Sequence, residues 1–399
     1  NSHFSFTLWS FSIMSSSANY AKVIGFTAAA VAAAVATYYL LNSDKKKTTT
    51  EPASSAPLSL PVVELSTFFN KDKDPESYRR ECEKVAHALH HYGLVVLKDP
   101  RVAEADNDRF VDMMEKYFEG SDGLRDARPE YGYQVGVTKE RVELPRNHCK
   151  AMGAYGPDNK PLSPCPPEKD PKWRFFWRTG PQPETTEFPA ENMDAVIPVE
   201  FPEWKEVMDG WGSQMTRALF TLAEMAAVGF KMPSDAFTSR MMYGPHLLAP
   251  TGSDFNKFGQ EGTVLAGFHY DLNFLTIHGK SRFPGLYVWT REGVRTAVSV
   301  PDGCLLVQAG KQIEYLTGGH VLAGFHEVLV NKSTSKVIEA KKAKGESLWR
   351  VSSTCFGHIA SDQVLQPLAP FNSPEAVEKF PAIKAGNQVI AELKAIALK

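Results

Sequence analysis

A histidine and an aspartate stand two positions apart in a stretch rich in β-forming residues. They are His269 and Asp271, in the sequence FHYDLNFLTI at residues 268–277. Along a β-strand, residues i and i+2 point to the same face, so the imidazole and the carboxylate would project side by side. Such a pair can supply two of the three protein ligands of a facial metal site, in which the other coordination positions stay open.

The third ligand of such a site has to come from a strand that returns to the same place. Two histidines and one carboxylate are the ligand set typical of non-haem Fe(II) sites. We expect His326 to complete it, because it shortly precedes an apolar Val-Leu-Val run. His278 lies too close in sequence to Asp271 to sit on another strand, and His320 follows a Gly-Gly pair and is expected to be a solvated turn residue. We expect His278 and His358 to be structural or to line the pocket.

Arg350 and Ser352 form a second pair with the same two-residue spacing. On one strand face, a guanidinium and a hydroxyl can grip a carboxylate, because the planar fork of arginine matches the carboxylate plane. Neither His-x-Asp nor Arg-x-Ser is informative alone, since most such pairs are surface or core residues. Their order and spacing within one β-rich segment carry the prediction.

The segment that contains both pairs resembles the C-terminal half of the Fe(II)/2-oxoglutarate dioxygenases of the isopenicillin N synthase type. After His-x-Asp, the resembling motifs follow in the family's order: GLYVW at 285–289, VSVPDG at 298–303 and LLVQAG at 305–310. Upstream, LPVVELS at 60–66 resembles the family's opening strand. The resemblance covers roughly residues 60–372.

The resemblance implies an α+β fold with a double-stranded β-helix, or jelly-roll, core that is backed by helices. It implies that Fe(II) is held by His269, Asp271 and His326, and that the far carboxylate of 2-oxoglutarate is held by Arg350 and Ser352. The implied activity is the O2-dependent oxidation of a small-molecule substrate by hydroxylation, desaturation or cyclisation, with release of succinate and CO2.

Three features depart from the family pattern. Lys311 stands where the family usually has aspartate. The interval that follows His326 is longer than in the family, and its Lys- and Ser-rich part, residues 331–347, is expected to form an extended hairpin. A reduced strand motif, RMMYGP, leaves Tyr243 as the residue expected to reach the cosubstrate.

Alternative interpretations keep part of this prediction. A non-haem iron oxidase of the same fold would dispense with the cosubstrate, and a catalytically silent, membrane-tethered binding protein would bind without turnover. A zinc hydrolase with the same ligands would need a paired general base, whereas the candidate Glu327 is expected to face outward because it neighbours His326 on a strand. Release of succinate and binding of iron discriminate among these hypotheses.

The composition is that of an ordinary globular protein. The chain has 399 residues, of which 43% are hydrophobic and 23% charged, and its formal net charge is −2. This length suits one large domain or two small ones, and the lack of a basic excess argues against a nucleic-acid partner. No Cys-x-x-Cys pair occurs, so reduced thiols are expected. The five cysteines are Cys82, Cys149, Cys165, Cys304 and Cys355.

The N-terminal part of the chain predicts attachment to a membrane. Residues 23–41 are 19 uncharged, mostly apolar residues, which is just enough to span a bilayer. Three lysines follow at 45–47, which predicts that the catalytic part is cytosolic. Residues 1–22 are expected to be a leader with the true start at Met14, and residues 42–59 a disordered linker. A cleaved secretory signal and an organelle-targeting presequence are the alternatives.

The rest of the chain divides into three parts. Residues 60–240 are expected to alternate helices and short strands, and residues 241–372 to form the β core with its metal site. Residues 373–399 are expected to end the chain in a helix, with Ser373 as its cap and Pro374 at its first position.

Patterns of apolar residues predict the elements that support the core. Asp74 can cap a helix that begins at Pro75 and that Gly93 ends. Residues 204–225 keep helical spacing of large apolar side chains, which predicts a long helix behind the β core. The aromatic stretch at 173–177 is expected in irregular sequence near the substrate mouth.

Overall fold

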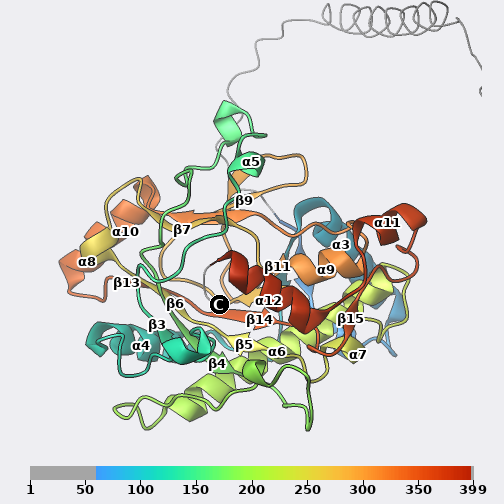
Figure 1. The fold of residues 1–399 in the computed structure, drawn as a ribbon, viewed down its shortest axis with the longest axis horizontal. Helices are drawn as coiled ribbons and strands as arrows, with labels where there is room; N and C mark the ends of the chain where they lie inside the picture. The colour runs from blue at the N-terminus through green and yellow to red at the C-terminus, as the bar shows by residue number, and fades with distance from the viewer. Residues whose placement is uncertain (1–59, 397–399) are drawn as a thin grey trace, which may run out of the picture. The chain divides into compact units, whose positions relative to one another are not determined.

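Two β-sheets face each other in the structure, a computed structural model that describes residues 60–396 (Figure 1). The larger sheet has ten strands in the order β1-β2-β11-β8-β14-β5-β4-β6-β13, with β3 paired to β4, and the smaller has the order β10-β9-β12-β7. The larger sheet comprises β1 (Val62–Glu64), β2 (Leu94–Lys98), β3 (Gly136–Thr138), β4 (Trp173–Arg178), β5 (Leu247–Leu248), β6 (Thr251–Asp254), β8 (Leu275–His278), β11 (Leu305–Ala309), β13 (Trp349–Ser352) and β14 (Thr354–Gly357). The smaller sheet comprises β7 (Val264–His269), β9 (Leu286–Trp289), β10 (Arg295–Ala297) and β12 (His326–Leu329).

From β6 onward, the chain passes back and forth between the two sheets. Strands β6, β8 and β11 lie in the larger sheet, β7, β9, β10 and β12 lie in the smaller one, and β13 and β14 return to the larger one. This alternation is the winding of a double-stranded β-helix. The predicted α+β fold with a sheet-rich core and supporting helices is confirmed.

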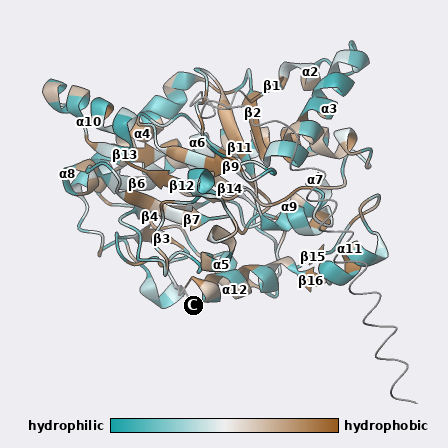
Figure 2. Ribbon diagram, turned by 90° about the horizontal axis from the view of Figure 1, so that it is seen from above, coloured by the Kyte–Doolittle hydropathy of each residue, from teal (hydrophilic) through white to brown (hydrophobic). Residues whose placement is uncertain are grey.

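Helices cover the face of the larger sheet that points away from the smaller sheet. Helix α4 (Glu104–Gly120) packs on β13, and helix α6 (Trp204–Gly229) packs on β5, β8 and β14. Hydrophobic residues are concentrated in the strands, while the outer helices carry more hydrophilic ones (Figure 2).

The other α-helices are α2 (Ser66–Phe69), α3 (Pro75–Tyr92), α5 (Cys149–Met152), α7 (Thr238–Met241), α8 (Phe255–Phe258), α9 (Lys311–Leu316), α10 (Lys332–Lys344), α11 (Pro374–Lys379) and α12 (Ala385–Ala395). Short 3₁₀ turns lie at Pro129–Tyr131, Pro157–Asn159 and Pro189–Glu191, and β15 (Val364–Leu365) pairs with β16 (Ile383–Lys384).

Helix boundaries follow the capping residues in the sequence. The Asp74 side chain accepts a hydrogen bond from the backbone N–H of Ser77 at 3.0 Å, and α3 ends at Gly93, which has φ +63°. A left-handed conformation suits glycine because it has no Cβ. Ser373 caps α11 in the same way, so the predicted starts of both helices and the long helix α6 are confirmed. The prediction of one helix over residues 373–399 is wrong, because β16, which pairs with β15, separates α11 from α12.

The prediction of a hairpin at residues 331–347 is wrong. Helix α10 occupies this stretch. The Asn331 side chain accepts from the Thr334 N–H at 2.9 Å, and the Thr334 hydroxyl accepts from the Asn331 N–H at 3.2 Å, which forms a capping box. Lysine, alanine and glutamate follow and favour helix, and Gly345 ends it with φ +67°.

Two further expectations are corrected. The aromatic stretch at 173–177 is not irregular, because it forms β4, which lies between β5 and β6 in the larger sheet. Cys149 and Cys165 are not reduced thiols but form a disulfide, with a Cα–Cα distance of 5.7 Å. Their separation of 16 residues has no recognisable motif, so only the fold brings them together.

The predicted leader, membrane segment and linker (residues 1–22, 23–41 and 42–59) lie outside the described residues. Within residues 60–396, no helix is both long and apolar enough to cross a bilayer.

Helix α6 provides a test of the core. Leu222 is fully buried on this helix, so Leu222→Ala is expected to lower the free energy of unfolding by about 2–5 kcal/mol, because it leaves a cavity. Ser213→Ala, at an exposed position of the same helix, is the control and is expected to change it by less than about 0.5 kcal/mol. Urea denaturation measures both, and equal effects would contradict the packing of α6.

Candidate metal and cosubstrate site

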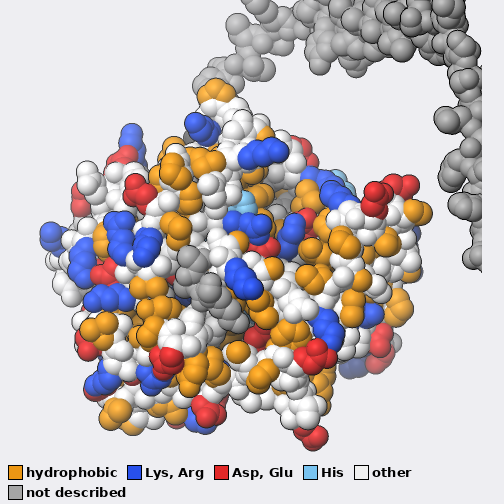
Figure 3. Space-filling model, in the orientation of Figure 1, with side chains coloured by type: hydrophobic (Ala, Val, Ile, Leu, Met, Phe, Trp, Pro, Cys, Tyr) orange, Lys and Arg blue, Asp and Glu red, His pale blue; other side chains and the backbone are white. Residues whose placement is uncertain are grey.

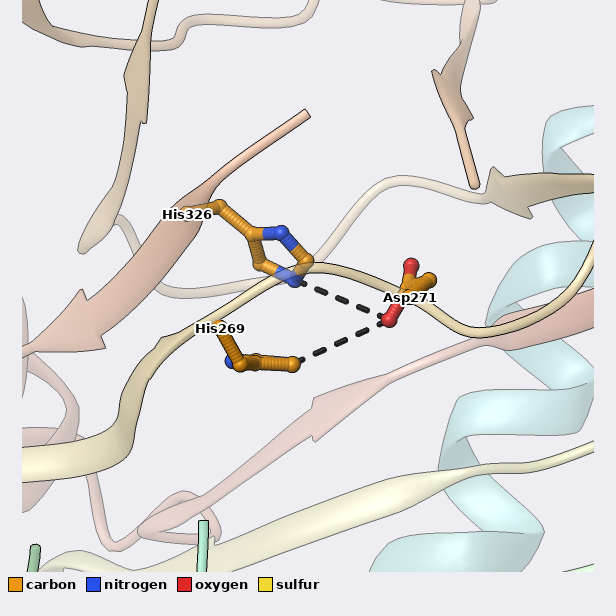
Figure 4. A group of neighbouring side chains, drawn as sticks. All are labelled: His269, Asp271 and His326. Carbon is orange, nitrogen blue, oxygen red and sulfur yellow. Dashed lines mark ion pairs between the residues drawn. The ribbon is translucent and has the colours of Figure 1, made fainter. Parts of the chain in front are cut away.

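His269, Asp271 and His326 come together at one end of the smaller sheet. His269 ends β7 and His326 begins the neighbouring strand β12, where the two residues are direct partners in the register. His269 Nε2 lies 3.7 Å and His326 Nε2 lies 4.0 Å from Asp271 Oδ1, and all three ligand atoms lie within 4.8 Å of one another. The three side chains point toward a common point, as Figure 4 shows. This is the predicted arrangement of two imidazoles and one carboxylate.

Hydrogen bonds to the backbone orient both imidazoles. His269 Nδ1 lies 2.6 Å from the Gly267 carbonyl oxygen, and His326 Nδ1 lies 3.1 Å from the Gly324 carbonyl oxygen. A carbonyl oxygen only accepts, so Nδ1 is the protonated nitrogen in each ring and Nε2 presents its lone pair. The two rings are therefore in the tautomer that binds a metal through Nε2.

The carboxylate is oriented as well. Asp271 Oδ2 accepts a hydrogen bond from the Thr276 hydroxyl at 2.6 Å, which leaves Oδ1 directed at the histidines. Burial opposes ionisation of this carboxyl, but His326 and His269 outweigh it and hold the pKa of Asp271 below its usual value. Burial, followed by the nearby His326, holds the pKa of His269 well below 6.5. A charged carboxylate and a neutral imidazole are the protonation states that a divalent cation requires.

Arg350 and Ser352 stand on the face of β13 that looks toward the smaller sheet. Burial lowers the pKa of Arg350 to about 10, so the guanidinium remains charged at neutral pH. No hydrogen bond or ion pair reaches this guanidinium from within residues 60–396, and its Nε is buried without a partner. A buried, unpaired cation is costly, and an anionic ligand would supply the missing partner. The Ser352 hydroxyl lies 3.0 Å from the Thr354 hydroxyl.

A single cavity of about 440 Å³ joins the three ligands to Arg350. Residues at every second position along three segments of the larger sheet line it: Arg350, Ser352, Thr354 and Phe356 from β13 and β14 with His358 just after them, Leu247, Thr251 and Ser253 from β5 and β6, and Arg174 and Phe176 from β4 with Lys172 just before it. This two-residue period follows from the pleat of the strands. The floor is polar near Arg350 and apolar near Phe356 and Phe176.

Helix α12 lies across the opening of this cavity. Val389, Glu392 and Leu393 of α12 line it. Glu392 pairs with Arg146 and lies 3.4 Å from the Tyr270 hydroxyl. Basic and hydrophobic side chains mingle at the centre of the face on which α12 lies (Figure 3). The C-terminal helix therefore contributes to the site.

The other histidines have structural surroundings. His278 does lie on a separate strand, β8, contrary to expectation, because residues 270–274 turn the chain back into the larger sheet. Its ring nitrogens lie 3.1 Å from Thr354 Oγ1 and 2.9 Å from Gln308 Oε1, so neither nitrogen is left for a metal. His358 lines the cavity, as allowed for in the prediction, and burial lowers its pKa to about 3.

His320 and Tyr243 differ from their predicted roles. His320 is not a solvated turn residue, because its ring stacks between His90 and Phe371 at centroid distances of 4.1 and 4.7 Å. Tyr243 is half exposed and does not line the cavity. It has φ +62° in the turn after α7, and this turn places Pro245, instead of the tyrosine, at the cavity wall.

Sequence reasoning missed Lys172 and Arg174, two cations that line the cavity. Lys172 pairs with Asp170 at 2.8 Å and with Glu143 at 3.3 Å, and Arg174 pairs with Glu143. Burial lowers the pKa of Arg174 to about 9, and its guanidinium lies 4.0 Å from the Phe176 ring centroid. The alternation Lys-x-Arg-x-Phe at residues 172–176 could have predicted that these three side chains share one strand face.

Comparison with known proteins agrees with this geometry. Residues 237–359 match the model of the 2OG-Fe(II) oxygenase superfamily, and this range contains both predicted pairs and His326. This part of the chain therefore resembles a 2OG-Fe(II) oxygenase domain. The predicted resemblance to the iron- and 2-oxoglutarate-dependent oxygenases is thereby confirmed over this range.

Two curated proteins match this chain over part of their length. Kihadalactone A synthase LFS of Citrus sinensis is 23% identical over 209 residues, which cover 49% of this chain and 56% of that protein. A 2-oxoglutarate-dependent dioxygenase of Gibberella zeae is 28% identical over 142 residues, 34% of this chain and 36% of that protein. The match thus spans about half or less of each relative.

Solved structures share the fold over most of this chain. A putative 2OG-Fe(II) oxygenase family protein from Caulobacter crescentus has a TM-score of 0.65 at 22% identity, covering 85% of this chain and 99% of its own. Full-length Neurospora crassa T7H in complex with alpha-KG has a TM-score of 0.65 at 16% identity, covering 86% and 98%. At these identities the likeness shows the fold.

The metal ligands can be tested by iron binding. Asp271→Ala is expected to abolish Fe(II) binding at concentrations that saturate the wild type, because it removes the carboxylate and leaves two neutral imidazoles. Anaerobic calorimetry measures the affinity. Asp302→Ala, which removes an exposed carboxylate, is the control and should bind as the wild type does. Retained affinity in Asp271→Ala would place the iron elsewhere.

Proposed function

We propose that this protein is an Fe(II)/2-oxoglutarate-dependent dioxygenase that oxidises a small organic molecule by hydroxylation, desaturation or cyclisation. The observation that carries the proposal is one cavity that contains both a three-ligand facial set and an unpaired, buried Arg350. Neither group has a complete set of partners within the described residues. A metal ion and a dicarboxylate supply what each lacks.

The residues present fit both cofactors. His269, Asp271 and His326 would hold Fe(II), and Arg350 with Ser352 would hold the distal carboxylate of 2-oxoglutarate. Bound together there, they supply oxidation of a substrate C–H bond by O2, with release of succinate and CO2. The protein's contribution is to position these groups and to keep other carboxylates away from Arg350.

Arg350 is placed to orient the cosubstrate. It pairs with Ser253 in the register of β13 and β6, and Ser352 pairs with Thr251, so small polar side chains surround the guanidinium on this face. A guanidinium binds a carboxylate through two parallel hydrogen bonds, which set the direction of the whole ligand. His278 holds the Thr354 hydroxyl from the next strand, and this hydroxyl in turn contacts Ser352.

The apolar end of the cavity is proposed to take the substrate. Phe176 and Phe356 of the larger sheet line the cavity, and so do Val389 and Leu393 of α12. Apolar walls favour a substrate with a largely apolar body. They also exclude water from the reacting groups, which strengthens the electrostatic interactions within the cavity.

Turnover of 2-oxoglutarate tests the proposal. The purified chain is expected to release succinate from 2-oxoglutarate only when Fe(II) and O2 are present, and Asp271→Ala is expected to release none. Uptake of O2 without succinate would instead identify an iron oxidase that needs no cosubstrate. Iron binding without either reaction, across a library of small molecules, would favour a binding protein and overturn the proposal.

Arg350 provides a second test. Arg350→Lys is expected to raise the KM for 2-oxoglutarate by about 10- to 100-fold, because a point charge replaces a bidentate pair worth roughly 1.5–3 kcal/mol per charged hydrogen bond. Arg109→Lys, which alters an exposed arginine paired with Glu206, is the control. An unchanged KM in Arg350→Lys would show that another group holds the cosubstrate.

We further propose that residues 23–41 attach the enzyme to a membrane with its catalytic part in the cytosol. The support is the uncharged 19-residue run and the three lysines that follow it. The whole chain is expected to stay with membranes after carbonate extraction, and a chain that lacks residues 23–41 is expected to be released. Release of both would contradict the attachment.

A further inference from the structure

Strand β7 contains an irregularity directly beside the ligand His269. In the register of β12 with β7, His326 is opposite His269 and Val328 is opposite Ala266. Glu327 alone is therefore opposite two residues of β7, Gly267 and Phe268. This is a β-bulge, which bends a strand and re-aims the side chains next to it.

Within residues 60–396, the bulge also lies on an edge strand of its sheet. The order of the smaller sheet is β10-β9-β12-β7, so β7 has a strand partner on one side. Register is weakly held where an edge strand is irregular, and a shift of one residue would turn His269 to the other face. Contacts from outside the sheet can therefore add to strand pairing in fixing this segment.

Two loop residues accept hydrogen bonds from the backbone N–H groups of the bulge. The Phe268 N–H donates to Ser163 Oγ at 2.7 Å, and the Gly267 N–H donates to Asp170 Oδ1 at 3.0 Å. The Gly267 carbonyl is the acceptor that orients the His269 ring at 2.6 Å. The Gly267 carbonyl that orients the His269 ring thus lies between two backbone N–H groups, those of Gly267 and Phe268. Both of these N–H groups are bound by residues outside the sheet.

Glu327 holds the loop that provides Ser163. Its carboxylate is fully buried on the face of β12 opposite His326, so it faces away from the cavity, as expected, but is not solvated. It accepts from the Ser163 hydroxyl at 2.8 Å, from the Ser163 N–H at 3.2 Å and from the Leu162 N–H at 3.1 Å. Arg295 Nη2 donates to it at 2.9 Å.

We propose that Ser163 and Glu327 form a positioning clamp that sets the iron affinity of the site. The clamp joins the residue after one histidine ligand, Glu327, to the residue before the other, Phe268, through a single serine hydroxyl. It thereby sets the separation and the ring orientation of His269 and His326. The inference rests on the proposed function, since it concerns the same iron site.

The energetics favour this role over simple packing. A buried carboxylate requires several hydrogen bonds and a paired cation, and Glu327 has both. Strand pairing alone does not need this carboxylate, because an apolar residue would fill the same place at lower cost in desolvation. Partners of this kind, one step removed from the metal, typically change metal affinity by about 10- to 100-fold when they are removed.

The test compares Ser163→Ala with wild type by Fe(II) affinity and by the visible spectrum of the Co(II)-substituted protein. Ser163→Ala removes the acceptor of the Phe268 N–H, so the Fe(II) Kd is expected to rise by about 10-fold and the Co(II) spectrum to change. Ser163→Thr restores a hydroxyl and is expected to recover most of the affinity. If Ser163→Ala does not fold, Glu327→Gln replaces it in the test. This variant keeps the shape of the side chain but removes its charge, and it is also expected to raise the Fe(II) Kd and to change the Co(II) spectrum.

Leu222→Ala serves as the matched control for lost stability. It weakens the core on the far side of the larger sheet and is expected to lower the melting temperature without changing the Fe(II) Kd or the Co(II) spectrum. If Ser163→Ala or Glu327→Gln binds iron as tightly as the wild type while losing stability as the control does, the clamp is merely structural and the inference fails. If wild-type protein itself binds no iron, the proposed function fails and the clamp falls with it.

Discussion

The site depends on the pairing of β12 with β7. This pairing sets His326 directly opposite His269, two residues that are far apart in the chain. Because side chains alternate along a strand, one step of slippage would turn a ligand away from the cavity. Asp271 follows on the same chain segment, so its position is set once β7 is in place. The crossing between sheets that brings β12 beside β7 is therefore the constraint on which the metal site rests.

Buried charge is the second constraint on this fold. The cavity contains the Asp271 carboxylate and the Arg350 guanidinium. These two groups do not form an ion pair with each other within the described residues. Burying charge without a partner costs free energy, and such groups occur where a ligand completes them. The wall from β4 behaves differently, since Arg174 has a carboxylate partner in Glu143. The unpaired cation therefore distinguishes the proposed cosubstrate end of the cavity from the other.

Local patterns predicted much of the fold. The caps Asp74 and Ser373 lie where their helices begin, because capping depends on a few neighbouring residues. The His269–Asp271 pair could be found for the same reason, since a two-residue spacing fixes a shared direction. The prediction of a hairpin at residues 331–347 fails because the Lys- and Ser-rich composition does not reveal the capping box at Asn331 that starts helix α10. Tyr243 was misplaced because a left-handed turn, invisible in composition, points its side chain outward.

The sequence by itself determined the residue types, their alternation along strands and the helix ends, and from these we could predict the family resemblance, the three candidate ligands and the Arg350–Ser352 pair. Only the tertiary structure decided which loop residues and which helix contact the elements that carry the site. It placed Ser163 between Glu327 and Phe268, which are 164 and 105 residues from it, and it brought α12 over the cavity. The physical reason is that spacing encodes direction only within one element, whereas contacts between elements depend on how the sheets wind and on which loops cover them.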